Sequence, residues 1–270
     1  MRKVGGLFVL TAALAGAQAS AQRQTIDATT ILSAAREALG GEKRLSAVKT
    51  FVATGRTRQI QGDNLVPIEF EISCELPDKY VRRDEIPARE SGPTSTGFNA
   101  ENLILLPSPP APLPDPAKLG RLNTARQDAT RLMLGMFAAS LPSYPLTFTY
   151  IGQAEAPQGK ADVLDVKGPA NFAARLFVNS ETHLPIMVSW QGAPPAGRGP
   201  AGPARPGGPG GAAPPPPPEN RLYYADYRDT DGMKWPFRIR RAVGTDTIEE
   251  TTFDRFRVNA KIDAKKFEGR

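Results

Sequence analysis

The residues of this chain that could carry out chemistry are few and lie far apart in the sequence. The chain contains one histidine, His183, and one cysteine, Cys74. Three-histidine zinc sites, multi-cysteine metal sites and a disulfide framework are therefore excluded. His183 falls in the turn-like segment 179–183, and a catalytic histidine needs a nucleophile or a carboxylate held beside it. The sequence nominates no such partner, so we expect His183 to be a solvated turn residue.

Three carboxylates could suggest sugar chemistry. Glu69, Glu71 and Glu75 share the polar face of one expected strand. Two carboxylates about 5–9 Å apart can serve as acid and base in a glycosidase. These three are evenly spaced and have no aromatic platform near them, so a solvated strand face is the better interpretation.

The segment Asp229–Gly232 resembles part of a calcium-binding loop. The first and last ligand positions of such a loop would be Tyr227 and Arg238, and neither is a carboxylate. A hairpin turn explains the segment better. We therefore expect no catalytic residue, no metal and no cofactor, in a protein that is not an enzyme.

Basic residues occur in pairs along the expected strands. Such pairs could contact anionic lipid headgroups or nucleic acid, although charged outer strand faces are the more common explanation. Export, indicated below, argues against nucleic acid. The pairs are Arg56 with Arg58, Arg82 with Arg83, and Arg238 with Arg240 and Arg241.

The first 21 residues have the pattern of a secretory signal peptide. Arg2 and Lys3 precede the mostly apolar segment 4–15, which is too short for an ordinary membrane span. Small residues at 17, 19 and 21 suit a signal peptidase, and we expect cleavage after Ala21. No cysteine follows to carry a lipid. We therefore predict a soluble, exported, periplasmic protein.

Glycine and proline are concentrated in one internal segment. Residues 192–218 hold 8 Gly and 11 Pro, and the rest are Ala and two Arg. Such a segment cannot bury a core and is typical of a disordered loop. We predict a single domain over 22–270 with 192–218 as an inserted loop. A tolerated surface insertion is the simplest interpretation. A partner-binding or spacer role is the alternative.

Alternating apolar residues predict a mainly β domain. The segment 66–76 alternates strictly, which is typical of a half-buried antiparallel strand. Similar segments at 49–60, 79–86 and throughout 145–258, with weaker ones at 95–99 and 101–106, bring the total to about ten or eleven strands. Residues on the apolar face of 66–76 are Val66, Ile68, Phe70, Ile72, Cys74 and Leu76.

Two helices interrupt this pattern. One is expected at 29–39, with Asp27 or Thr29 as its cap and Gly40 after its end. The other is a long amphipathic helix at 121–141, preceded by the proline cluster 107–116. Together with the strands, these helices predict an α+β fold in which one curved sheet wraps over the helices.

Five phrases in order carry a resemblance to a known family. They are ALGGEKRLSAVKTFVATGR, LPDKYVRRD, FVNSETHLPIMVSW, YYADYRDTDGMKWPFRI and VNAKIDAKKFEG. In this order they resemble the exported outer-membrane lipoprotein-sorting proteins, the half-barrel family that includes LolA and LolB. The resemblance spans nearly all of the chain after the leader, except the proline-rich insert. It implies an open antiparallel half-barrel whose concave face holds helices and binds acyl chains. One relative of this fold senses envelope stress by binding lipids or proteins.

The function expected is that of a non-catalytic carrier of a lipid or lipoprotein acyl chain. A curved sheet with one apolar face must cover that face, and a loosely fitting helix would leave an apolar pocket. The candidate ligand-binding residues on the 121–141 helix are Leu132, Met133, Met136 and Phe137. Methionine suits variable apolar ligands, although such a stripe can equally seal a core.

The alternative is an envelope sensor or protein-interaction module that uses a sheet edge or the insert. The expected partners are an acyl chain and, further, a membrane or an envelope protein. No nucleic acid is expected, and the protein is expected to be a monomer.

Overall fold

The structure, a computed structural model, describes residues 27–62, 64–156, 159–192 and 217–269. The expected signal peptide 1–21 lies outside the described residues, as do 193–216 of the expected insert. The division into a leader, one domain of 22–270 and a loop insert therefore stays a prediction.

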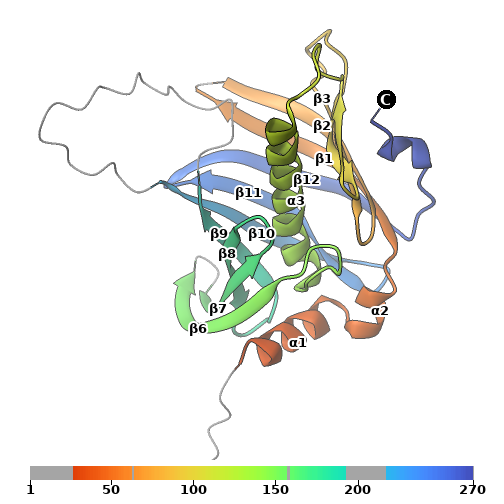
Figure 1. The fold of residues 1–270 in the computed structure, drawn as a ribbon. Coiled ribbons are helices and arrows are strands. Elements are labelled where there is room, and N and C mark those ends of the chain that lie inside the picture. Colours follow the sequence, from red (N-terminus) through yellow and green to blue (C-terminus); the bar gives the residue numbers. More distant parts are fainter. Residues whose placement is uncertain (1–26, 63, 157–158, 193–216, 270) are drawn as a thin grey trace, which may run out of the picture.

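The described residues form twelve strands in a single antiparallel sheet (Figure 1). The order is β5-β4-β3-β2-β1-β12-β11-β10-β9-β8-β7-β6, so only the β1–β12 pair joins strands distant in sequence. The two edge strands β5 and β6 do not pair, and the sheet stays open. The predicted open antiparallel half-barrel is confirmed, with twelve strands in the described residues where about ten or eleven were expected. The strands are β1 (Thr50–Gln61), β2 (Asn64–Glu75), β3 (Lys79–Glu85), β4 (Thr94–Asn99), β5 (Asn102–Leu106), β6 (Thr147–Ala156), β7 (Gly159–Gly168), β8 (Phe172–Asn179), β9 (Pro185–Gln191), β10 (Glu219–Thr230), β11 (Met233–Val243) and β12 (Asp246–Val258).

Local sequence explains the turns between these strands. Asp231 and Gly232 join β10 to β11 with φ values of 57° and 74°, as a hairpin of the primed type requires. The Asp229 carboxylate accepts a hydrogen bond from the Gly232 backbone N–H at 3.1 Å. The expected hairpin turn at 229–232 is therefore confirmed. His183 is exposed in the turn between β8 and β9, as predicted, with φ of 57°.

Helices α1 (Ala28–Leu39) and α2 (Glu42–Ser46) lie at one end of the sheet (Figure 1). Asp27 caps α1 by accepting a hydrogen bond from the Thr30 N–H at 2.7 Å, and Gly40 ends it with φ of 132°. The Arg36 guanidinium of α1 donates to the Phe137 carbonyl oxygen at 2.8 Å. This bond fixes the C-terminal end of the central helix, whose last carbonyls have no partner within the helix.

The central helix α3 runs from Asp115 to Phe137, which corrects the predicted span of 121–141. It begins earlier because Pro116 lies in the first turn, where the missing N–H costs no helical hydrogen bond. It ends earlier because Ala138 adopts a left-handed conformation with φ of 46°. Leu141 therefore lies outside the helix and forms an isolated bridge with Tyr144. The remaining helical segment is the short η1 (Ala264–Phe267) near the chain end.

Helix α3 stands inside the curve of the sheet, with its C-terminal half in the core (Figure 1). Gly135 allows this close approach, because a Cβ there would lie 2.4 Å from the Tyr224 ring on β10. The Tyr227 hydroxyl lies 2.7 Å from the Gly135 carbonyl oxygen and also joins helix to sheet. Residues 115–121, in contrast, are all exposed. None of the helices in the described part of the chain combines the length and hydropathy needed to cross a membrane.

The insert can be tested by replacing it. Gln191 of β9 and Glu219 of β10 are direct cross-strand partners, so a two-residue Asn-Gly turn can replace 192–218. The replacement removes the Asn220–Gly192 hydrogen bond of 3.0 Å but shortens the loop greatly. We expect Tm in a thermal melt to be unchanged or higher. Loss of the cooperative melt, or a clear fall in Tm, would show that 192–218 belongs to the fold.

Candidate functional site

A trough of about 280 Å³ lies between α3 and the concave face. It crosses the sheet from β3 to β9, and residues of α3 lie along it. We call this cavity the trough. Its apolar lining consists of Ile68, Ile72, Leu132, Leu222, Ile239 and Phe253, together with the rings of Tyr80 and Trp190. Its volume is close to the lower end of the ~300–1,000 Å³ typical of small-molecule sites.

Charged side chains also line the trough, which the sequence interpretation did not anticipate. Arg82 and Arg241 were expected on outer strand faces, and this expectation was wrong for both. Each has an arginine neighbour in sequence, and adjacent strand residues point to opposite faces. One member of each pair must therefore face the concave side. The charged lining consists of Arg82, Asp84, Asp128, Arg131, Arg241 and Glu249.

Arg82 is fully compensated by its neighbours. Its Nε lies 2.7 Å from the Asp84 carboxylate, and its Nη2 donates to the Thr57 hydroxyl at 3.0 Å. Burial lowers the pKa of Arg82, but the Asp84 and Glu249 carboxylates outweigh this, and the net shift of the pKa is upward. This end of the trough therefore holds a satisfied ion pair.

Arg131 and Arg241 are placed differently, at the end of the trough beside Trp190. The Cζ of Arg131 lies 4.2 Å from the Trp190 ring centroid, and that of Arg241 lies 5.3 Å from it. The two guanidiniums share one carboxylate, Asp128, at 2.9 Å from Arg131 and 3.9 Å from Arg241. Burial lowers the pKa of Arg131, and the charge of Arg241 lowers it further, against the opposing effect of Asp128.

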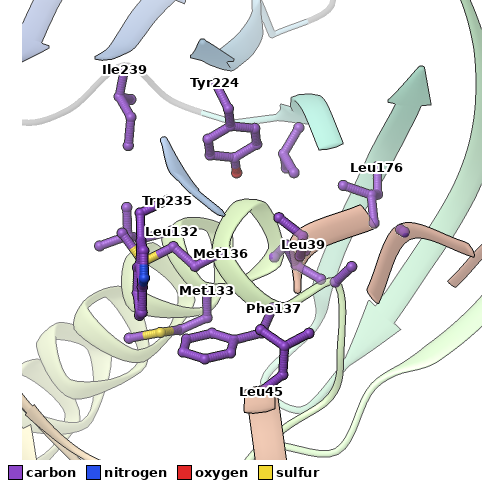
Figure 2. Packing of buried hydrophobic residues seen from close by; sticks show 14 of the residues in the cluster. Leu39, Leu45, Leu132, Met133, Met136, Phe137, Leu176, Tyr224, Trp235 and Ile239 are labelled. Atoms are coloured by element: carbon purple, nitrogen blue, oxygen red, sulfur yellow. The ribbon is translucent and has the colours of Figure 1, made fainter. Parts of the chain in front are cut away.

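The four predicted ligand-binding residues are all buried, but they divide between different surroundings (Figure 2). Leu132 lines the trough. Met133 lines a second cavity of about 30 Å³, which is the size of one water molecule. Met136 and Phe137 belong to the main core cluster and line neither cavity. Contact between these two residues and a ligand would require α3 to leave its packed position.

Sequence signals for the remaining trough residues are weaker. Arg131 lies outside the apolar stripe of its helix in the sequence, yet it is only 6% exposed. Its spacing from Asp128 is the ordinary one of a surface ion pair, so only the fold reveals its burial.

Cys74 lines the second cavity, and burial raises the pKa of its thiol, so it stays protonated. No group of three or more metal-ligating side chains occurs within the described ranges.

Solved structures share this architecture. No family model and no curated protein matches the sequence. A LolA superfamily protein from Nitrosomonas europaea superposes with a TM-score of 0.55 at 14% identity, over 90% of this chain and 98% of the other. An outer membrane lipoprotein-sorting protein domain from Vibrio parahaemolyticus gives 0.50 at 9% identity, over 89% and 97%. The predicted resemblance to the lipoprotein-sorting half-barrels is confirmed at the level of the fold.

Proposed function

We propose that this protein is a non-catalytic, exported binding protein that holds a lipid or lipoprotein acyl chain in its concave face. The observation that carries this proposal is the trough, whose apolar side chains come from α3 and from the sheet. Each methylene group buried there contributes about 0.8 kcal/mol. Burial of a chain of about ten carbons would therefore supply enough free energy for binding, and this function needs no catalytic group.

The choice of ligand draws on the shared fold. The similar Vibrio parahaemolyticus domain is described as lipoprotein-sorting, and a lipoprotein presents acyl chains to its carrier. A periplasmic location, a monomeric state and the absence of nucleic-acid binding belong to the same proposal. Fold alone does not determine function, so the apolar surface of the trough is the stronger support.

Helix α3 would act as the movable cover of the trough. Its C-terminal part from Ala129 to Phe137 is buried in the core, whereas residues 115–121 are exposed and Leu119 is 56% exposed. The exposed half makes few apolar contacts that resist displacement. The buried part of α3, which supplies Arg131 and Leu132 to the trough, would stay anchored while residues 115–121 move.

Trp190 provides a direct test, because it lines the trough while Trp235, the only other tryptophan, does not. In the Trp235→Phe variant we expect 2-bromododecanoate, which carries its bromine beside the head group, to quench most of the fluorescence. In the Trp190→Phe variant, which reports from Trp235, we expect much weaker quenching. Absent quenching in both variants, or equal quenching in both, would contradict binding in the trough.

A second candidate function is the interaction module, and the edge strand β6 supports it. Within the described residues β6 pairs only with β7, so its other edge carries backbone groups suited to adding a strand. Ile151 on this strand is 46% exposed. A module that acted only through this edge would leave the brominated chain unbound and Trp190 unquenched.

A further inference from the structure

Two guanidiniums beside Trp190, one buried and one half-buried, are only partly neutralised. Arg131 and Arg241 share Asp128, whose side chain is 46% exposed, whereas theirs are 8% and 20% exposed. Of the other acids of the trough, Asp84 pairs with Arg82. Glu249 is the cross-strand partner of Arg241 and acts on Arg82, but among the described residues it forms no ion pair with Arg131 or Arg241. A buried charge is costly unless it is paired, so this end of the trough favours a further negative group.

The hydrogen-bonding capacity of these arginines is also incompletely used. The Nη groups of Arg131 contact Asp128 and Gln127, at 2.9 and 3.2 Å. The Nε atoms of Arg131 and Arg241 are both buried, and neither has a hydrogen-bond partner among the described residues. Arg131 as a whole is more than nine-tenths buried and lines the trough. Unsatisfied buried donors are rare in folded proteins and point to a missing acceptor.

The aromatic ring holds the two cations in place without neutralising them. Both guanidiniums lie within 6 Å of the Trp190 ring centroid, the range of a cation–π contact. A planar guanidinium fixed in this way loses little freedom when it binds the oxygens of a carboxylate or a phosphate. The arrangement is therefore prepared for an oxyanion.

The apolar part of the trough begins directly beside this cationic end. Leu222 on β10 is the cross-strand partner of Arg241, and Ile239 lies two residues before Arg241 on the same face of β11. A ligand with its head at the arginines would thus place its next atoms against these two side chains.

We propose that the ligand of this protein is an anionic amphiphile. Its carboxylate or phosphate head is bound by Arg131 and Arg241 beside Trp190, and its alkyl chain lies along the trough. This inference rests on the proposed function, because the same trough must hold the chain. It adds the chemical class of the head group and the residues that select it.

The test compares ligands that differ only in their heads. Dodecanoate, dodecyl phosphate and dodecan-1-ol, each below micelle-forming concentrations, are titrated into the full protein by calorimetry, with inorganic phosphate as the anion alone. Charge-assisted hydrogen bonds predict Kd values for both anionic ligands about 10- to 100-fold lower than for the alcohol. In Arg241→Gln we expect this preference to shrink to about threefold or less.

The matched control is Arg238→Gln, which removes the same charge from the same strand. Arg238 is exposed and lies outside the trough, so the preference for anionic heads should persist. The comparison of the three dodecyl ligands in the unmodified protein tests the head-group inference even if Arg241→Gln fails to fold.

The outcomes separate the two proposals. Equal Kd values for the acid and the alcohol would overturn the head-group inference and leave the acyl-chain proposal standing. Binding of none of the three dodecyl ligands would overturn both. If inorganic phosphate bound as tightly as dodecyl phosphate, the two arginines would form a site for a free anion. This result would overturn the proposal that the ligand is an amphiphile.

Discussion

Replacing Trp235 with alanine is expected to lower the free energy of unfolding by about 3–5 kcal/mol, the largest stability effect of any single change proposed for this protein. Trp235 is 1% exposed and lies beside α3 at the centre of the core (Figure 2). Its ring stacks on Phe256 at 4.8 Å between centroids and lies within 6 Å of the rings of Phe51 and Phe137. The substitution removes these contacts and leaves a large cavity between sheet and helix.

Urea denaturation measures this loss, and two variants act as controls. Lys234→Ala changes the exposed neighbour on the same strand and should alter the free energy of unfolding by about 0.5 kcal/mol or less. The Trp235→Phe variant should lose less than half of the free energy of unfolding that the Trp235→Ala variant loses. It keeps a ring and removes an indole N–H that is buried without a partner among the described residues. An alanine cost near that of Lys234→Ala would show that the helix does not pack on the sheet as described.

Replacing Leu132 with tryptophan is expected to weaken acyl-chain binding by at least about 30-fold while the protein stays folded. Leu132 is 8% exposed and is the predicted ligand-binding residue that lines the trough. An indole there would occupy space that a chain of methylene groups needs, and each displaced methylene loses about 0.8 kcal/mol of binding free energy. Titration with dodecanoate measures the change, and a thermal melt verifies the fold.

The matched control for this variant is Leu119→Trp on the same helix. Leu119 is 56% exposed and lies outside the trough, so the same substitution there should leave Kd within about twofold. If both variants bind dodecanoate as well as the unmodified protein, the chain does not occupy the trough. If both lose binding equally, the exposed half of α3 matters and the trough lining does not.

Most of the sheet was predictable from sequence because one-sided burial imposes a period of two. The segment 66–76 shows this, since Phe70, Ile72 and Cys74 are buried on the concave side while Glu69 is exposed. Turn residues such as Gly232 predicted where hairpins join the strands. The boundaries of α3 were less predictable. Proline is favourable in a first helical turn, but the proline cluster 107–116 conceals where the helix begins, and an alanine in the left-handed conformation at the other end contradicts ordinary expectations.

The candidate site was predicted only in part. The apolar spacing on α3 selected Leu132, which lines the trough, together with Met136 and Phe137, which lie in the core and do not line it. Periodicity shows that a residue is buried without showing whether a cavity adjoins it. The cationic end of the trough joins Arg131, Trp190 and Arg241 from three separate elements, and only the folded sheet brings them together.

Native mass spectrometry of the exported protein tests the central claim most directly. The protein, produced with its leader in a bacterial host and purified without detergent, is compared with its Leu132→Trp variant. We expect the unmodified protein to carry about one acyl-chain ligand per chain and the folded variant to carry none. A folded, unmodified protein that emerges without ligand and takes up no added dodecanoate would contradict acyl-chain binding in the trough.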